Sequence, residues 1–480
     1  MGHMSELAPI HFEHKVTGPT LYLSLYRQIV NQISSGHLTP GSRLPSSRSL
    51  AAELGCSRGT VERAYELLLA EGYICSAGAA GTRVNPNLDL RQLANVPRVA
   101  MKPTHEQEQA SAAVSSVLPF QLGLPALDAF PRTLWNRLIN RHGRSTAIEQ
   151  FSRGDSFGYF PLRQALANYL AISRGVNAEP EQIFITAGFQ GALSMIIQCL
   201  AKVGDKVWCE DPGYFRARDC LHQLGMSVIA VPVDEEGLRV DEGIKNALDA
   251  KFALVTPTHQ APMGVMLSLA RRLALLDWAE NQGSWIIEDD YDGEFRYGEA
   301  PLPALKRLDT HERVIYTGSF SKVLIPSLKL GYVVVPKSLQ VRFETAFSSL
   351  WSVGSLLEQK AVTELMTRRH FSRHIQKMRK LYGERRDALA AELERKLAKE
   401  LDVRLQAGGM HLLGRLFNEV DEGELQRRGR QLGLGLHFLS SFQVSATQPT
   451  TLLLSFTNVD VASTEAAVQS LRRAIALSRL

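Results

Sequence analysis

Lys322 lies in a run of small and hydroxyl-bearing residues, with Ser319 and Ser321 just before it. Roughly thirty residues earlier, a hydrophobic stretch ends in a cluster of acids that includes Asp289 and is followed by Tyr291. A lysine amine can form a Schiff base with an aldehyde, and a carboxylate can keep the nitrogen of a pyridine ring protonated. Because each group directly follows a predicted strand, the pattern predicts a site for pyridoxal phosphate.

The elements around Lys322 are predicted to form a mostly parallel sheet. From about residue 118 to 480, hydrophobic strands alternate with long helices, and Gly, Asn, Asp and Pro residues separate them. One basic amphipathic helix is expected over about 358–400, and a smaller αβ unit closes the chain. The turn over 186–193 joins a predicted strand to a predicted helix, whose N-terminal N–H groups would suit a phosphate.

The first ninety residues have a different pattern, that of a winged helix-turn-helix. Leu25, Ile29 and Ile33 recur at helical spacing, and Ser57 and a serine after Pro45 are predicted to cap two further helices. Residues 72–84 are predicted to form a strand, a glycine-rich tip and a second strand. We therefore expect a DNA-binding domain over 19–84, a linker over 85–117 and a second domain over 118–480.

The predicted recognition helix begins with residues suited to DNA. In a helix-turn-helix, the second helix enters the major groove with its N-terminal residues facing the base edges. Arg58 could therefore read guanine, while Ser57 and Thr60 could hold phosphates. A lone arginine in a sequence is more often a solvated surface residue. The prediction of DNA contacts therefore depends on the order in which these residues follow one another along the chain. The residues expected to contact DNA are Arg43, Ser46, Arg48, Ser57, Arg58, Thr60, Arg63 and Arg83.

Both parts of the chain resemble known families. The run from Leu44 to Tyr73 closely resembles the winged helix-turn-helix of the GntR family, over most of residues 20–84. Residues 118–480 resemble the fold-type I aminotransferases, which are α/β proteins that use pyridoxal phosphate. A GntR-type head followed by such a body is typical of the MocR subfamily of bacterial transcription regulators.

The resemblance implies a role for each matching residue. Lys322 matches the Schiff-base lysine, Asp289 the carboxylate that pairs with the ring nitrogen, and Tyr291 the tyrosine that hydrogen-bonds the ring hydroxyl. Asp289 is chosen by alignment alone, because two further acids lie within three residues of it. Tyr214 matches the aromatic residue that stacks on the ring, although a tyrosine packed in the core would look the same in the sequence. The residues at the phosphate-binding positions are Gly188, Phe189, Gln190, Ser319 and Ser321.

Three positions depart from the family pattern. Lys329 stands where an arginine usually grips the phosphate, so the charge is kept but the planar fork is lost. Arg153 stands where the partner subunit usually contributes a tyrosine, and we expect it to offset the change at Lys329. Thr451 stands at the place of the arginine that binds the substrate carboxylate, which argues against ordinary turnover of α-amino acids. The candidate substitutes for that arginine are Arg415, Arg428 and Arg430.

Composition limits the number of domains, the possible partners and the cellular compartment. A chain of 480 residues with 45% hydrophobic and 21% charged residues suggests two or three globular domains. The net charge is only +5, so a basic surface for DNA must be local. Five cysteines without a Cys-x-x-Cys pair favour the reducing cytoplasm, and we expect neither a signal peptide nor a membrane span. His370 and His374 share a helix face, but no third ligand is evident and no metal site is expected.

The expected function is a regulator of transcription that depends on pyridoxal phosphate. The head would bind double-stranded promoter DNA, and the body would sense an amine or amino acid, or pyridoxal phosphate itself. The resemblance also implies a homodimer in which domains are swapped. One alternative is a bifunctional aminotransferase with a DNA-binding head, which Thr451 opposes. Another is a body that binds no cofactor and only dimerises, which Lys322, Asp289 and Tyr291 oppose.

Overall fold

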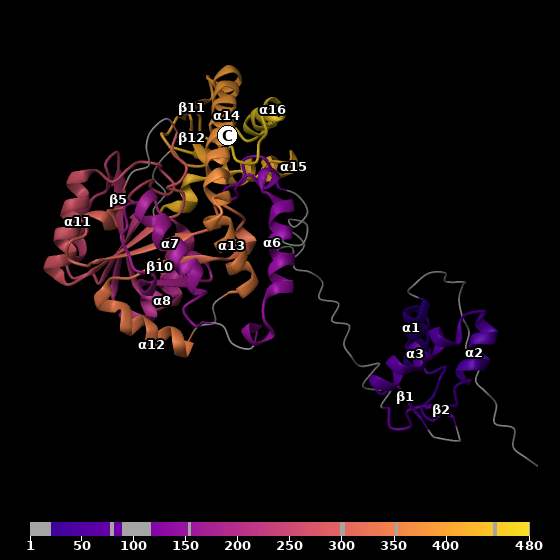
Figure 1. The fold of residues 1–480 in the computed structure, drawn as a ribbon. Helices are drawn as coiled ribbons and strands as arrows, with labels where there is room; N and C mark the ends of the chain where they lie inside the picture. Colours follow the sequence, from indigo (N-terminus) through magenta and orange to yellow (C-terminus); the bar gives the residue numbers. More distant parts are fainter. Residues whose placement is uncertain are drawn as a thin grey trace, which may run out of the picture. The chain divides into compact units, whose positions relative to one another are not determined.

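A computed structural model of the chain describes residues 21–76, 81–88, 117–151, 155–297, 303–350, 354–444 and 449–479. The chain divides into two compact units, residues 1–115 and residues 116–480, which we call the head and the body (Figure 1). Among the described residues, no helix has the length and apolar character needed to cross a membrane.

The head is a three-helix unit followed by a hairpin. Its helices are α1 (Leu21–Ser34), α2 (Ser47–Leu54) and α3 (Arg58–Ala70), and its strands are β1 (Ile74–Ser76) and β2 (Thr82–Val84). The two strands pair antiparallel, with Ile74 opposite Val84. Residues 77–80, within the strand–tip–strand segment predicted over 72–84, lie outside the described residues. The apolar core joins all three helices and the hairpin, and includes Leu25, Ile29, Ile33, Leu50, Val61, Leu68, Ile74 and Val84.

Serine caps fix the turn between α2 and α3. The Ser46 hydroxyl accepts a hydrogen bond from the Ser49 N–H group, and the Ser57 hydroxyl accepts one from the Thr60 N–H group. Gly55 ends α2 with φ of 63°, a left-handed conformation that glycine adopts without the Cβ penalty. Ser57 and Arg58, at the start of α3, are both exposed.

The body is built on an eight-stranded sheet with the order β3-β10-β9-β8-β7-β4-β5-β6. Six strands run parallel, whereas β10 and β6 run antiparallel to their neighbours. The strands are β3 (Ile183–Thr186), β4 (Lys206–Asp211), β5 (Ser227–Asp234), β6 (Gly237–Leu238), β7 (Phe252–Val255), β8 (Trp285–Asp290), β9 (Val314–Ser319) and β10 (Gly331–Val334).

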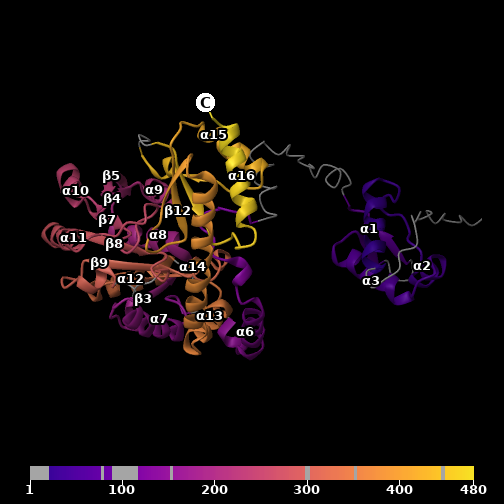
Figure 2. The same ribbon diagram turned by 90° about the horizontal axis from the view of Figure 1, so that it is seen from above.

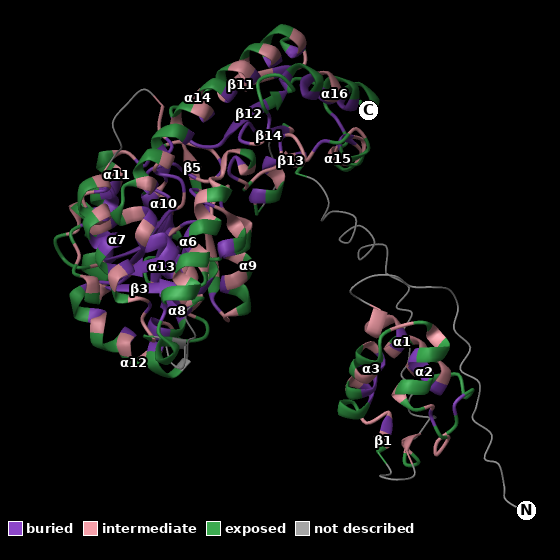
Figure 3. Ribbon diagram, turned by 45° about the vertical axis from the view of Figure 1, so that its right-hand side comes forward, coloured by how far each residue is buried: buried purple, intermediate pink, exposed green. Residues whose placement is uncertain are grey.

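Helices cover both faces of this sheet. In β3, Ile183 and Ile185 pack in one core cluster with α7 (Phe160–Ser173) and α13 (Leu356–Thr367), whereas Phe184 packs in another. That second cluster contains side chains of α8 (Gly188–Leu200), α9 (Phe215–Gln223) and α12 (Gln340–Leu350). Figure 3 shows the buried strands inside a shell of helices whose outer faces are exposed. Burial on both faces explains why the strands are continuous hydrophobic runs rather than alternating ones. The remaining helices of this part are α6 (Arg132–Ser145), α10 (Val240–Ala247) and α11 (Leu269–Gln282).

A smaller αβ unit closes the chain, as the sequence predicts. Its antiparallel sheet has the order β11-β12-β14-β13. Its elements are β11 (Leu401–Arg404), β12 (His411–Leu416), α15 (Glu422–Gln431), β13 (His437–Phe438), β14 (Thr451–Ser455) and α16 (Thr464–Leu477). The long helix α14 (His370–Leu397) packs against it through Leu389, Leu393 and Leu397 (Figure 2).

The prediction of one helix over about 358–400 is wrong. The structure has two helices there, α13 and α14, separated at Arg368 and Arg369. Arg369 adopts a left-handed conformation with φ of 61°. Neither residue is a glycine or a proline, so the sequence holds no local signal for this break.

Candidate functional site

The two predicted phosphate-binding turns meet at one edge of the sheet. Strand β10 pairs with both β3 and β9, and Gly331 lies opposite Thr186 on one side and Ser319 on the other. A Cβ atom on Gly331 would lie 2.9 Å from the backbone of Gly188. The first turn of α8 and the residues that follow β9 are therefore close neighbours.

Hydroxyls and a helix start make this edge suitable for a phosphate. The Ser319 and Ser321 hydroxyls are 2.8 Å apart, and Gly188 opens α8 with φ of 71°. Gln190 is exposed, and Lys329 has a left-handed backbone with φ of 43°. Arg153, expected to reach the same phosphate from the partner subunit, lies outside the described residues.

Three acids at the end of β8 have different partners. Asp290 is buried against Arg174, whose Nη2 donates to it at 2.8 Å, and it also accepts a hydrogen bond from the Tyr316 hydroxyl. Asp292 lies 3.0 Å from Nδ1 of His259. Asp289 is only 8% exposed, yet no group in the described part of the chain donates a hydrogen bond to its carboxylate.

Asp289 faces a small cavity that also contains the predicted stacking residue. The cavity is lined by Tyr214, Phe189 and Glu210 among others. Burial raises the pKa of the Asp289 carboxyl well above its usual range, and the charges of Asp290 and Asp292 raise it further. A buried carboxylate without a donor is costly, so this position suits a cationic ring nitrogen from a bound group.

Lys322 lies just beyond the end of β9, within electrostatic range of Asp289. Its Nζ donates a hydrogen bond to the carbonyl oxygen of Gly123 at 2.7 Å. Burial lowers the pKa of the Lys322 amine, while the charges of Asp292 and Asp289 oppose that shift. A lowered pKa increases the fraction of neutral amine, which is the form that attacks an aldehyde.

The hydroxyl of Tyr291 is part of a buried network. It lies 2.9 Å from Nδ1 of His259, and Nε2 of His259 lies 3.3 Å from Oε1 of Gln406. Burial by itself would lower the pKa of His259, but the charge and hydrogen bond of Asp292 raise it above its ordinary value. Through His259, these contacts connect Tyr291, just after β8, to Gln406, between β11 and β12.

Sequence reasoning missed two charged residues near the predicted site. Glu210, on the cavity wall, accepts hydrogen bonds from the Thr256 N–H group and the Gln260 amide, and burial raises its pKa to about 7. Arg216 is exposed, but its positive charge adds to the burial that lowers the pKa of Lys322, and it opposes the burial that raises the pKa of Tyr214. Arg216 follows Tyr214 by two residues, a spacing that could have drawn attention to it.

Thr451 is buried at the start of β14. Its hydroxyl donates to the carbonyl oxygen of Pro449 at 3.0 Å. Arg415, one of the three candidate substitutes, is the exposed residue directly opposite Thr451 on β12. Arg428 is paired with Glu424 on α15. Of the three arginines, Arg415 is thus the one that the sheet places next to Thr451.

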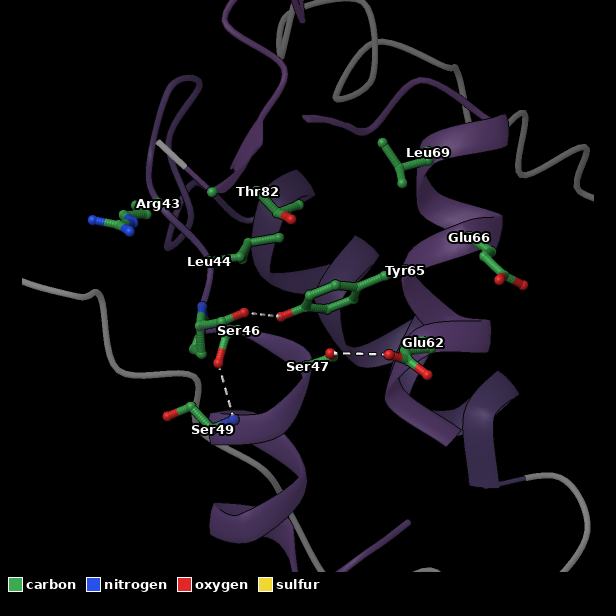
Figure 4. A pocket seen from close by; sticks show the side chains of 12 residues that line it. Arg43, Leu44, Ser46, Ser47, Ser49, Glu62, Tyr65, Glu66, Leu69 and Thr82 are labelled. Atoms are coloured by element: carbon green, nitrogen blue, oxygen red, sulfur yellow. Dashed lines mark hydrogen bonds between the residues drawn. The ribbon is translucent and has the colours of Figure 1, made fainter. Parts of the chain in front are cut away.

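The head presents an open depression between α2, α3 and the wing. Figure 4 shows its lining, with the Ser47 hydroxyl pointing across the gap toward Glu62 of α3. Of the residues predicted to contact DNA, Arg43 and Ser46 lie on this wall. Two acids, Glu62 and Glu66, share it.

The other predicted DNA contacts divide into two groups. Arg48, Ser57 and Arg58 are exposed around the turn between the helices, and Thr60 bonds to the Ser57 hydroxyl. Arg63 lies over the ring of Tyr22, and Arg83 donates to the carbonyl oxygen of Gly41. These last two arginines thus hold parts of the head together.

Comparisons with known proteins agree with this architecture. The model of bacterial regulatory proteins, gntR family, matches residues 21–84, and that of aminotransferase class I and II matches residues 139–471. The chain is 33% identical over 468 residues to the probable rhizopine catabolism regulatory protein MocR of Rhizobium meliloti, covering 95% of this chain and 93% of that protein. It is 35% identical over 367 residues to the pyridoxine biosynthesis transcriptional regulator PdxR of Corynebacterium glutamicum, covering 75% and 76%.

Solved aminotransferases resemble the body. A kynurenine aminotransferase of Pyrococcus horikoshii is 27% identical with a TM-score of 0.69, covering 81% of this chain and 98% of that one. The α-aminoadipate aminotransferase LysN of Thermus thermophilus is 29% identical with a TM-score of 0.68, covering 76% and 94%.

Fold and site therefore define a winged helix-turn-helix protein with a fold-type I aminotransferase-like body, which confirms the predicted fold class. The chain belongs to the aminotransferase class I and II family and is a transcriptional regulator of the MocR type with a GntR-family head. The family of its body uses pyridoxal phosphate, and its head is a DNA-binding domain.

Proposed function

We propose that the body binds pyridoxal phosphate at Lys322 and that an amine effector, or the cofactor itself, thereby changes the affinity of the head for promoter DNA. The observation that carries this proposal is the Asp289 carboxylate. It is buried, has no donor in the described part of the chain, and lines a cavity with Tyr214.

The residues at the site fit the cofactor. When bound, pyridoxal phosphate supplies an aldehyde that reacts with amines and a ring that accepts electrons. Asp289 would hold the ring nitrogen protonated, Tyr214 would lie against the ring, and the Lys322 amine would react with the aldehyde. Tyr291, oriented by His259, would donate to the ring hydroxyl.

The phosphate would lie where the first turn of α8 meets the end of β9. Gly188, Phe189 and Gln190 begin α8, and its N–H groups there would hold the phosphate together with the Ser319 and Ser321 hydroxyls. Lys329 would add a positive charge without the bidentate geometry of an arginine.

Lys322 also has a contact that could carry a signal. Its amine donates to Gly123, near the start of the body. Holding the cofactor would take Lys322 Nζ out of its hydrogen bond with Gly123, and a Lys322 that no longer held the cofactor could form that hydrogen bond again. This change would bias the segment that follows the linker, in the way that a ligand shifts a two-state equilibrium.

An aminotransferase with a DNA-binding head is the second candidate. The similarity of the body to solved aminotransferases favours it. The buried Thr451 at the expected place of the carboxylate-binding arginine opposes it. Continuous formation of a keto acid from an amino donor would establish turnover.

Absorbance spectroscopy tests the proposed site. The full-length protein incubated with pyridoxal phosphate should gain a visible band that stays after gel filtration, and the band should shift when a responsive amine is added. Lys322→Ala should hold the cofactor weakly and lack the lysine-dependent band. A wild-type protein that stays colourless would refute cofactor binding.

We also expect the protein to be a homodimer in the cytoplasm, and sedimentation can test the dimer.

A further inference from the structure

The start of α3 carries a pair of opposite charges on its exposed face. Arg58 is the first residue of the helix and Glu62 lies one turn later. Nε of Arg58 donates to Oε1 of Glu62 at 2.8 Å, and the two side chains are 66% and 43% exposed. An acid at this place is unexpected, because the phosphates of DNA repel it.

The ion pair with Glu62 engages only Nε of the Arg58 guanidinium. A guanidinium has five N–H donors, and here only the one on Nε is engaged with an acceptor in the described part of the head. The four donors on the two terminal nitrogens belong to a side chain that is 66% exposed. Guanine presents two acceptors, O6 and N7, at the edge that faces the major groove.

Glu62 is itself held from a second helix. The hydroxyl of Ser47, the first residue of α2, lies 3.4 Å from the same Oε1 atom (Figure 4). The carboxylate therefore has contacts on both helices of the helix-turn-helix. A side chain fixed in this way restricts the orientation of the guanidinium attached to it.

We propose that Glu62 is a positioning residue that sets the base preference of the head: it holds the Arg58 guanidinium so that its two terminal nitrogens meet O6 and N7 of a guanine. The inference rests on the proposed contact between Arg58 and a base. It has a distinctive consequence, because Glu62 raises sequence discrimination while its negative charge lowers affinity for all DNA.

Glu66 provides a matched control. It is exposed on α3, one turn beyond Glu62, and lines the same depression. Within the described head it forms no ion pair. Removing Glu66 therefore removes the same charge from the same surface without releasing an arginine.

The experiment begins with selection of binding sites from a library of randomised DNA duplexes by the full-length protein. Wild type should enrich a guanine at a fixed position. Replacing this guanine with adenine should weaken binding on the order of 10–100-fold, the range for a good bidentate contact. Arg58→Ala should lose this difference and bind the guanine and adenine duplexes with nearly equal affinity. Should wild type enrich no guanine, or Arg58→Ala keep the difference, the Arg58 contact itself is refuted.

The Glu62 variants then test the inference. Glu62→Ala should bind both duplexes more tightly but lose most of the ratio between its affinities for the guanine and adenine duplexes. Glu66→Ala should also bind both duplexes more tightly, but it should keep that ratio. Glu62→Gln retains an oxygen acceptor for Nε, so it should keep more of the ratio than Glu62→Ala, and its similar shape guards against a folding defect. The inference is overturned if Glu62→Ala tightens binding to both duplexes by one common factor, as Glu66→Ala does.

Discussion

The three acids around the end of β8 look equivalent in the sequence, but their surroundings differ. Arg174 neutralises Asp290 and His259 faces Asp292, whereas Asp289 has no donor in the described part of the chain. The sequence could choose Asp289 only by alignment, and the structure adds a physical reason for the same choice. Its role with the ring nitrogen stays a prediction.

Asp289→Asn tests this role directly. The variant should bind pyridoxal phosphate about 10–100-fold more weakly, because a hydrogen bond to a charged group contributes about 1.5–3 kcal/mol. Equilibrium titration of visible absorbance measures the change. Unchanged affinity would mean that another group holds the ring nitrogen.

Without cofactor, the same substitution should not destabilise the protein at neutral pH. Burial raises the pKa of the Asp289 carboxyl in the folded state, so the neutral form is favoured there. The free energy of unfolding is therefore highest below the ordinary carboxyl pKa of about 3.9, and it falls as pH rises from that value to the folded pKa. Asp289→Asn removes this loss. Thermal unfolding of the cofactor-free proteins at pH 7 should give a melting temperature for the variant no lower than that of wild type.

His259→Asn should have the opposite effect on stability. Asp292 raises the pKa of His259, so the charged pair stabilises the fold below the ordinary histidine pKa of about 6.5. This stability is lost as pH rises through the folded pKa. The variant should lose about 3 kcal/mol or more at pH 6, since it removes the ion-pair partner of the buried Asp292 carboxylate, and less at higher pH. Denaturant unfolding at a series of pH values measures this, and an equal loss at every pH would contradict the ion pair.

At the scale of elements, the features that the sequence predicts well have local causes. The serine caps and apolar spacing of the head, and the hydrophobic strands of the body, follow from short-range patterns. The break at Arg369 and the network of Tyr291, His259 and Gln406 depend on tertiary contacts between distant segments. No local pattern in the sequence encodes them.

The close approach of β10 to α8 can be tested with one methyl group. Gly331→Ala would place a Cβ atom 2.9 Å from the backbone of Gly188, which should cost roughly 1–3 kcal/mol of stability and weaken cofactor binding. Gly383→Ala on α14 is the matched control, because its Cβ meets nothing closer than 4.0 Å and alanine favours a helix. Chemical denaturation and cofactor titration of both variants measure the difference. If Gly331→Ala behaves like the control, the two turns do not form one phosphate site.

At the scale of the whole molecule, the chain joins a DNA-binding head to a body whose family uses pyridoxal phosphate. If the ligand changes the affinity of the head for DNA, then DNA must change the affinity of the body for the ligand by the same factor. Under the proposed function, the hydrogen bond between Lys322 and Gly123 is the contact through which a bound ligand would act on the segment that follows the linker.

The most direct test measures the affinity of the full-length protein for a selected DNA duplex at one salt concentration. Three states are compared: without cofactor, with pyridoxal phosphate, and with pyridoxal phosphate plus each of a panel of amines. Wild type should change its DNA affinity by about 5–150-fold in at least one step, the usual range of coupling between sites, and Lys322→Ala should not respond. Equal DNA affinity of wild type in all states, or the same response from Lys322→Ala, would contradict a regulator that acts through Lys322.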